Sequence, residues 1–363
     1  MVVLQQEWRL YARMLSSLRS GDCAALESLL DLGLDPDTSF QLGGWARPAL
    51  CLAAERGYAK LVALLCTRHC STARPDRDGL SALHLAAVYG YTEVAAALLE
   101  HRAEINKACP GSGDTPLHLA ASHNQVQMVS FLLNRGANPD VQNKDDKTPL
   151  MYAAAKGNVV PVRLLVAHDA NVYATDRGGN TPLLLHTASA WLNLEVAEWL
   201  CPDREAANFG NFAGSSPVLE VVKSTCSVRQ EVLRYLVKKG EDLDVTTALG
   251  STPLHLACSN ADWSSARILV RGGARLDIFD SLGRSPMFIV LQNENLLLAE
   301  TMKAAGASCQ LPEDLYQQLG PASKLFATRR QVDSLKYTSR RTLRRIWGRS
   351  TDSRLDDVLI PTI

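Results

Sequence analysis

Residues 115–150 read TPLHLAASHNQVQMVSFLLNRGANPDVQNKDDKTPL, and the tripeptide that opens this stretch returns at its end. Thr115 and Thr148, which begin the two copies, are 33 residues apart. Related four-residue blocks recur on both sides of this stretch, and their first residues are 48, 81, 115, 148, 181, 216, 252 and 285. Intervals of 33 to 36 residues predict one supersecondary unit that is copied along most of the chain.

Each block is typical of the start of a helix. Thr or Ser can cap the free N–H groups of the first turn, and the Pro that usually follows has no N–H to leave unpaired. After Thr115, the small residues Ala120 and Ala121 let a neighbouring helix approach, and a turn is expected near Asn124. A second helix with apolar residues at helical spacing is predicted to end at Gly136. An Asp- and Gly-rich loop then leads to the next block.

This period and layout resemble those of the ankyrin-repeat family, over about four fifths of the chain. The resemblance implies an all-α repeat solenoid of about nine stacked units, because one repeat cannot bury its apolar face alone. Residues 1–47 are predicted to be an N-terminal capping unit, with a helical pair at about 8–33 and no Thr-Pro block. Further repeats are expected over 48–310, a linker over 311–328 and a separate tail over 329–363.

The resemblance also implies a function, because members of the family hold other proteins on the concave side and the loop tips of the solenoid. Specificity is expected where the repeats are least regular, between residues 181 and 252, since aromatic anchors are frequent at binding hot spots. Trp199 is interpreted as replacing a core Leu in a second helix. The candidate residues for binding the unknown protein substrate are Trp191, Phe209, Phe212 and Trp263.

Three histidines share one position in the repeat. His84, His118 and His255 are each the fourth residue of their block. A common position favours a structural role, in which a neutral imidazole satisfies local backbone and hydroxyl groups, over metal binding or acid–base chemistry.

The sequence offers no catalytic or metal centre. Cys66, His69 and Cys70 lack a second ligand pair at zinc-finger spacing, so no metal is predicted. The chain contains no nucleophile elbow, no phosphate-binding loop and no zinc-protease motif, so neither an enzyme nor a cofactor is expected. Nine scattered cysteines, an odd number, suit reduced thiols in the cytoplasm, with the nucleus left open.

The charge balance excludes a strong global field. Lys and Arg together number 38, as do Asp and Glu, so no nucleic-acid partner is expected for the chain as a whole. Residues 1–15 lack the apolar core of a signal peptide, and no stretch approaches the roughly 18 apolar residues of a membrane span.

The tail after the repeats is locally basic. The segment from Arg329 to Arg349 contains eight basic residues and one acidic residue, Asp333. Asp333 or Ser334 can cap a helix that runs to about Trp347. Apolar residues near one face of this helix could then dock in a partner's groove.

The segment from Ser334 to Arg344 resembles the first helix of a SOCS box, whose usual pattern is Ser-Leu-x-x-Leu-Cys-Arg-x-x-Ile-Arg. In the ankyrin-repeat and SOCS-box family this helix inserts into elongin C, while the repeats hold a substrate for a cullin-RING ubiquitin ligase. The resemblance therefore implies a substrate-receptor subunit with elongin B/C and a cullin as partners. The implied elongin-binding residues are Leu335, Ser339, Leu343, Ile346 and Trp347.

The match has two departures. Ser339 stands where the family has a buried Cys, and Thr338 where it usually has Leu. The segment that selects the cullin in the family is represented only by residues 359–361, which leaves the cullin contact open. The alternative is an ankyrin scaffold without ligase function, whose basic tail docks on an acidic protein, a phosphoinositide or nucleic acid.

Overall fold

A computed structural model describes residues 2–42, 45–308 and 313–328 of the chain. These residues contain 21 helices and one two-stranded hairpin, and the chain divides into two compact units, residues 1–286 and 287–363. The helix-rich repeat architecture expected from the sequence is confirmed. The predicted limits of the four segments remain predictions.

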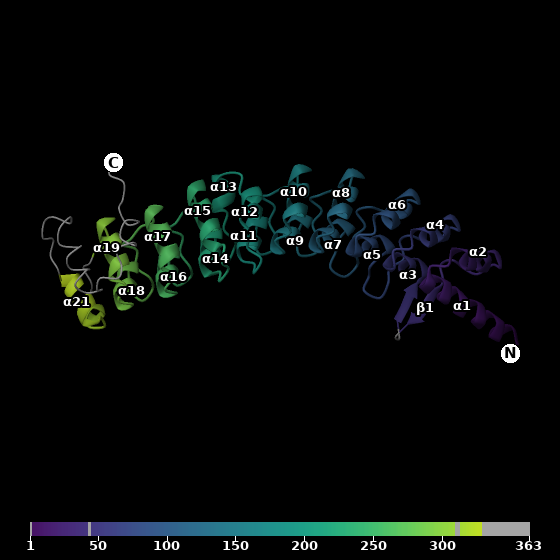
Figure 1. The fold of residues 1–363 in the computed structure, drawn as a ribbon, viewed down its shortest axis with the longest axis horizontal. Coiled ribbons are helices and arrows are strands. Elements are labelled where there is room, and N and C mark those ends of the chain that lie inside the picture. The colour runs from purple at the N-terminus through teal and green to yellow at the C-terminus, as the bar shows by residue number, and fades with distance from the viewer. Residues whose placement is uncertain (1, 43–44, 309–312, 329–363) are drawn as a thin grey trace, which may run out of the picture. The chain divides into compact units, whose positions relative to one another are not determined.

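Helices of the first unit come in successive pairs joined by short turns (Figure 1). The first four pairs are α1 (Val2–Ser20) with α2 (Cys23–Asp31), α3 (Ala49–Glu55) with α4 (Ala59–Thr67), α5 (Ala82–Tyr89) with α6 (Thr92–Glu100), and α7 (Pro116–Ser122) with α8 (Val126–Asn134). The next four are α9 (Pro149–Ala155) with α10 (Val159–Ala167), α11 (Pro182–Thr187) with α12 (Leu194–Leu200), α14 (Pro217–Lys223) with α15 (Arg229–Lys239), and α16 (Pro253–Ser259) with α17 (Trp263–Arg271). A short helix, α13 (Arg204–Asn208), follows α12.

The helices form two rows. First helices of successive pairs pack on one another from α3 to α16, and second helices do the same from α2 to α17 (Figure 1). Small residues such as Ala120 and Ala121 are fully buried in the first row, and leucines such as Leu132 in the second. Fully burying one leucine side chain stabilises the fold by roughly 1.5 to 3 kcal/mol. The stack is therefore held mainly by contacts between neighbouring repeats.

The N-terminal region differs from its prediction in two ways. Helix α1 begins at Val2, ahead of the expected start near residue 8. Strands β1 (Ser39–Leu42) and β2 (Trp45–Pro48) form an antiparallel hairpin after the expected helical pair, where an all-α fold predicts no strand. Each strand has only four residues, which is too short for an alternating pattern to stand out from the surrounding loop.

The interpretation of Trp199 as a core residue is wrong. Its side chain is 38% exposed, whereas Val196, Ala197 and Leu200 are buried. The side chain of Asn193 caps α12 by accepting the N–H groups of Glu195 and Val196. Because a helix has 3.6 residues per turn, this start turns positions 196, 197 and 200 inward and position 199 to the edge.

The second unit contains α18 (Pro286–Gln292), which starts at its boundary, α19 (Leu296–Ala304), α20 (Glu313–Tyr316) and α21 (Pro321–Thr328). The Ser323 hydroxyl donates a hydrogen bond of 2.7 Å to the Leu291 carbonyl, which fixes α21 against α18. The region expected as a linker therefore holds two helices.

Candidate functional site

Three repeats have a capping histidine that joins the repeat to the next one. In α7 the Nδ1 atom of His118 accepts the backbone N–H of Thr115 at 3.1 Å and lies 2.8 Å from the Thr115 hydroxyl. Because Nδ1 accepts a backbone N–H, the ring proton is on Nε2, which donates to the Lys147 carbonyl at 2.9 Å. His118 therefore joins the start of its own helix to the loop that precedes the next block.

His84 and His255 make the same bonds in their own blocks. The rings reach the carbonyls of Asp114 and Arg284 at 3.1 Å and 3.0 Å. Burial lowers the pKa of all three histidines below its usual value, so the rings are neutral near pH 7. The structural interpretation of these histidines is confirmed, and neither ring nitrogen is left for catalysis.

Five of the turns between repeats share one hydrogen-bond pattern. An Asp or Asn at the first position turns its Oδ1 atom inward, where it accepts the N–H groups two and four residues ahead. At Asp280, for example, these bonds come from Leu282 at 3.0 Å and Arg284 at 2.9 Å. The same arrangement occurs at Asp76, Asn143, Asp176 and Asn211. Satisfying the backbone internally leaves the side chains at the tips free to point outward.

Backbone hydrogen bonds also join neighbouring turns. Arg177 donates its N–H to the Asp145 carbonyl at 3.1 Å, and Phe212 donates to Gly178 at 3.1 Å. Ser281 donates to Leu249 at 2.9 Å in the same manner. Each bond holds the two turns that it joins in fixed register, which suits a preorganised binding surface.

The chemistry of the tips changes along the stack. The turns at residues 76–79, 143–146 and 176–179 present charged side chains, and Arg177 pairs with Asp146 of the preceding turn at 3.6 Å. The last three turns of the first unit instead present Phe212, 84% exposed, and Leu249 and Leu282, each 68% exposed. We call Phe212, Leu249 and Leu282 the apolar tip row. Single exposed apolar residues are ordinary, but three successive turns that each present one, with Leu249 and Leu282 at the same position of the turn, indicate a binding surface.

The four candidate substrate-binding residues do not form one cluster. Phe212 belongs to the apolar tip row, and Trp191 is 65% exposed in the turn between α11 and α12, at the other end of those helices. Phe209, at the end of α13, and Trp263, the first residue of α17, are half-buried. Their role in binding stays a prediction, and the geometry singles out Phe212.

Leu249 and Leu282 were missed in the sequence. Each stands directly before the Gly of its turn, in Thr-Ala-Leu-Gly-Ser and Asp-Ser-Leu-Gly-Arg. Aligning the turns with one another would have shown apolar residues at positions that are charged in earlier repeats. The five residues expected to bind elongin, from Leu335 to Trp347, lie outside the described residues.

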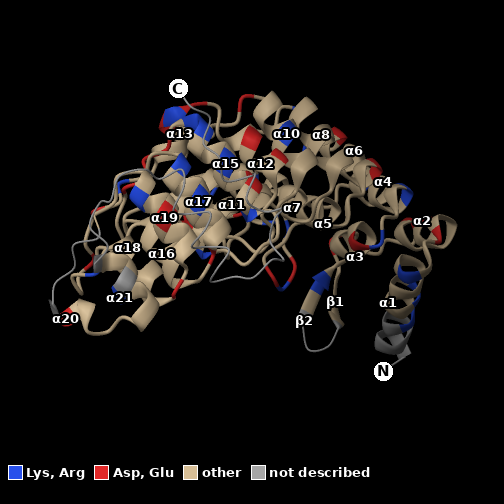
Figure 2. Cartoon of the chain, turned by 60° about the vertical axis from the view of Figure 1, so that its left-hand side comes forward, with Lys and Arg blue, Asp and Glu red and all other residues tan. Residues whose placement is uncertain are grey.

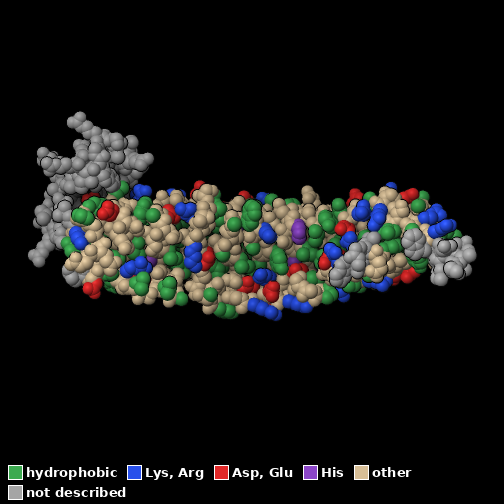
Figure 3. All heavy atoms as spheres, turned by 90° about the horizontal axis from the view of Figure 1, so that it is seen from below, with side chains coloured by type: hydrophobic (Ala, Val, Ile, Leu, Met, Phe, Trp, Pro, Cys, Tyr) green, Lys and Arg blue, Asp and Glu red, His purple; other side chains and the backbone are tan. Residues whose placement is uncertain are grey.

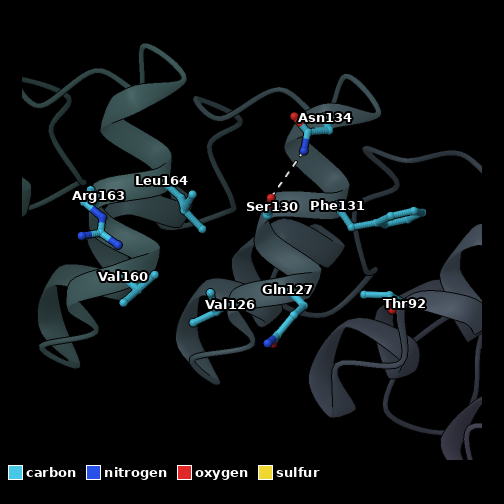
Figure 4. A pocket seen from close by; sticks show the side chains of 9 residues that line it. All are labelled: Thr92, Val126, Gln127, Ser130, Phe131, Asn134, Val160, Arg163 and Leu164. Carbon is cyan, nitrogen blue, oxygen red and sulfur yellow. Dashed lines mark hydrogen bonds between the residues drawn. The ribbon is translucent and has the colours of Figure 1, made fainter.

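A shallow groove crosses the second helices α6, α8 and α10 (Figure 4). It has a volume of 590 Å³ and is lined by Thr92, Val126, Gln127, Ser130, Phe131, Asn134, Val160, Arg163 and Leu164. The lining mixes apolar and polar side chains without a group of titratable residues. Hydrophobic side chains also reach the surface at many places on the face seen in Figure 3. Acidic and basic residues alternate over the helices, with Lys and Arg most frequent around α13, α15 and α17 (Figure 2).

The two cysteines near His69 are buried, and Cys70 has a local hydrogen-bond partner. The Cys70 thiol donates to the Asp37 carboxylate at 3.2 Å, and burial raises the pKa of both Cys66, to about 11, and Cys70. Within the described ranges, no three His, Cys, Asp or Glu residues are grouped to hold a metal ion. Nor does any helix in those ranges combine the length and apolar character needed to cross a bilayer.

Comparison with known families points to the same repeat. A family model described as ankyrin repeats (3 copies) matches residues 117–211 and 224–312, which together are just over half of the chain. A second model, ankyrin repeats (many copies), matches residues 83–133.

Similar proteins carry varied names. Ankyrin repeat and KH domain-containing protein 1 of Homo sapiens is 39% identical over 101 residues, 28% of this chain and 4% of that protein. Transient receptor potential cation channel subfamily A member 1 of Homo sapiens is 28% identical over 176 residues, 48% of this chain and 12% of that protein. E3 ubiquitin-protein ligase XBAT33 of Arabidopsis thaliana is 31% identical over 121 residues, 33% of this chain and 23% of that protein.

The chain thus spans less than a quarter of the length of each of these relatives, and what they share with it is the repeat. The recurring blocks, the stacked helix pairs with their capping histidines, and the matching family models together show that this chain belongs to the ankyrin-repeat family.

Proposed function

We propose that this chain is a non-catalytic receptor subunit, which holds a partner protein on its repeats and delivers it to a ubiquitin ligase through its C-terminal segment. The observation that carries the binding role is the apolar tip row. Phe212, Leu249 and Leu282 are exposed on turns whose backbone groups are bonded internally and to neighbouring turns. Apolar side chains on a preorganised surface lose little entropy when a partner covers them.

The ligase role rests on the sequence of the C-terminal segment. The SOCS-box pattern assigns Leu335 and Leu343 as anchors in elongin C, with Ser339, Ile346 and Trp347 beside them on the same helix. A relative named as an E3 ubiquitin-protein ligase supports the same pathway. The subunit would act by proximity in the cytoplasm or nucleus, with no cofactor and no bond chemistry of its own.

A second candidate is an ankyrin scaffold without ligase function. The density of Arg and Lys between residues 329 and 349 favours it, because such a run attracts acidic proteins, phosphoinositides or nucleic acid through charge alone. Charge-driven binding falls steeply as salt rises, whereas an apolar helix docked in a groove is much less sensitive to salt.

Co-expression of the full chain with elongins B and C tests the ligase role. We expect a stoichiometric complex that survives 0.5 M salt and is abolished by Leu335→Asp. Lys336→Asp is the matched control, since it places the same charge at a neighbouring position that the pattern leaves variable. If no complex forms even at low salt, the ligase role is wrong. If both variants weaken binding equally and salt removes it, the scaffold is the better description.

A further inference from the structure

We propose that the apolar tip row binds an amphipathic α-helix of the partner, through apolar side chains spaced seven residues apart. The inference rests on the proposed function for the surface and adds the class of structure that the surface recognises. The argument depends on the spacing of the tips, on the use of their backbone groups and on the side chains that they present.

The spacing of the tips matches a helix. Each turn joins two short extended segments. The Ser281 N–H bonds to the Leu249 carbonyl, so the facing segments of these two neighbouring turns lie at the distance of paired strands. Strands lie about 4.8 Å apart, so successive tips repeat about every 10 Å. A helix rises 1.5 Å per residue, so side chains seven residues apart are separated by about 10.5 Å and share one face. Phe212 stands one position earlier in its turn, and its ring lies against Gly179 of the preceding turn, so the spacing of about 10 Å applies to Leu249 and Leu282.

An extended strand along the row fits less well. Its side chains on one face are separated by about 6.8 Å or about 13.6 Å, and neither value matches the tips. A strand also needs free backbone groups on its partner. The Leu249 carbonyl is already bonded to Ser281, and the N–H of Leu282 is bonded to Asp280.

A polyproline helix is the closer rival, because every third residue advances about 9.3 Å on one face. Its backbone carbonyls, however, have no internal partners and are recognised in aromatic-lined grooves. Phe212, Leu249 and Leu282 carry no hydrogen-bond donor. The backbone hydrogen bonds of an α-helix are made within the helix. Its apolar face needs only apolar contacts from a partner, and these three side chains can provide them.

The residues beside the tips are uncharged, namely Ala213, Ala248 and Ser281. A partner is therefore selected by apolar contact, without an ion pair at the tips. A second copy of the chain is a poor occupant, because a stable dimer buries about 800 Å² on each partner, far more than three separate side chains offer. A single apolar helix face is of the right width.

Peptide selection on the full chain tests the inference. Two displayed libraries of 20-residue peptides are compared, one in an Ala/Glu/Lys helical frame and one in a Pro-rich frame, each randomised between apolar and polar residues. Enriched peptides are then measured on Leu249→Asp, on Leu282→Asp and on Asp145→Ser, which alters the equivalent position of a charged turn. Unchanged urea midpoints verify that all three variants fold.

We expect enrichment from the helical library, with apolar residues seven positions apart. Affinity should fall at least tenfold on Leu249→Asp and on Leu282→Asp, and stay within twofold on Asp145→Ser. Pro-rich binders that respond to Leu249→Asp would retain the surface but overturn the helix. Binders that ignore both leucine variants would overturn the proposed surface itself. No enrichment from the helical library would also reject the helix.

Discussion

The side chain of Glu241 caps α14, because its Oε1 atom accepts the backbone N–H of Val218, the second residue of that helix and 23 residues earlier in the chain, at 2.7 Å. Ser216, the residue before α14, makes no capping bond, and Leu219 stands where three other blocks have His. Equivalent positions after the stop glycine hold Ala in several repeats, as at Ala137. Glu241 therefore accepts an N–H group in the first turn of a helix that lacks the capping box of other repeats.

This cap predicts that Glu241→Gln stabilises the protein at neutral pH. Burial raises the pKa of Glu241 well above its usual value, with Asp242 adding to the shift, and Oε2 has no hydrogen-bond partner among the described residues. Gln keeps a carbonyl oxygen for the Val218 N–H and carries no charge to bury. We expect a gain of about 1 kcal/mol at pH 7 in urea unfolding.

The sign of the pH effect follows from linkage. A raised folded-state pKa gives stability that is fully present below the unfolded pKa of about 4.3 and is lost as pH rises through the folded value. The advantage of Glu241→Gln should therefore shrink toward pH 4. Glu231→Gln, at an exposed position on α15, is the control. A Glu241→Gln variant that is less stable at pH 7 would contradict this account.

Loss of a capping histidine should destabilise the stack. His118→Ala removes the bonds to Thr115 and Lys147 and leaves buried polar groups without partners. We expect a loss of roughly 2 to 3 kcal/mol, measured as a lower urea midpoint by circular dichroism. His123→Ala, which changes an exposed histidine at the end of the same helix, should stay within about 0.5 kcal/mol. Equal effects of the two substitutions would show that the capping box is unimportant.

Acid should weaken the fold through the same histidines. Burial lowers the folded-state pKa of His84, His118, His186 and His255, so their contribution is fully present above the unfolded pKa of about 6.5 and is lost as pH falls below it. We expect the urea midpoint to fall between pH 6.5 and 5, with a smaller slope in His118→Gln. An identical slope in the variant would mean that His118 does not titrate there.

Substitution by Ala should lower stability by different amounts at two glycines that have similar φ angles. Gly136 has φ of 85° and open space where a Cβ would lie, so Gly136→Ala should cost only the left-handed penalty of about 1 to 2 kcal/mol. Gly113 has φ of 80°, but its Cβ would lie 2.8 Å from the Lys144 backbone nitrogen. Gly113→Ala must displace the Lys144 turn, so its urea midpoint should fall further. Similar midpoints for both variants would indicate that the turn yields easily.

Much of the fold could be predicted because the same local sequence signals recur in successive repeats. Thr115 and His118, the alanines of α7 and the stop at Gly136 each act within one helix pair, and they have equivalents in other repeats. Helix starts, the neutral histidines and the stacking of pairs therefore follow from sequence. The β1–β2 hairpin could not be predicted, since it occurs once and its strands are short.

Only the tertiary structure decided which of the residues that depart from the repeat pattern contact one another and which are exposed. The burial of Val196, Ala197 and Leu200 sets the register of α12 and leaves Trp199 at the edge, although an aromatic residue suits a core position equally well. Glu241 finds Val218 only through the packing of α15 beside α14. The turns of Leu249 and Leu282 are held in register by the bond from the Ser281 N–H to the Leu249 carbonyl, and a local pattern carries no information about such a distant contact.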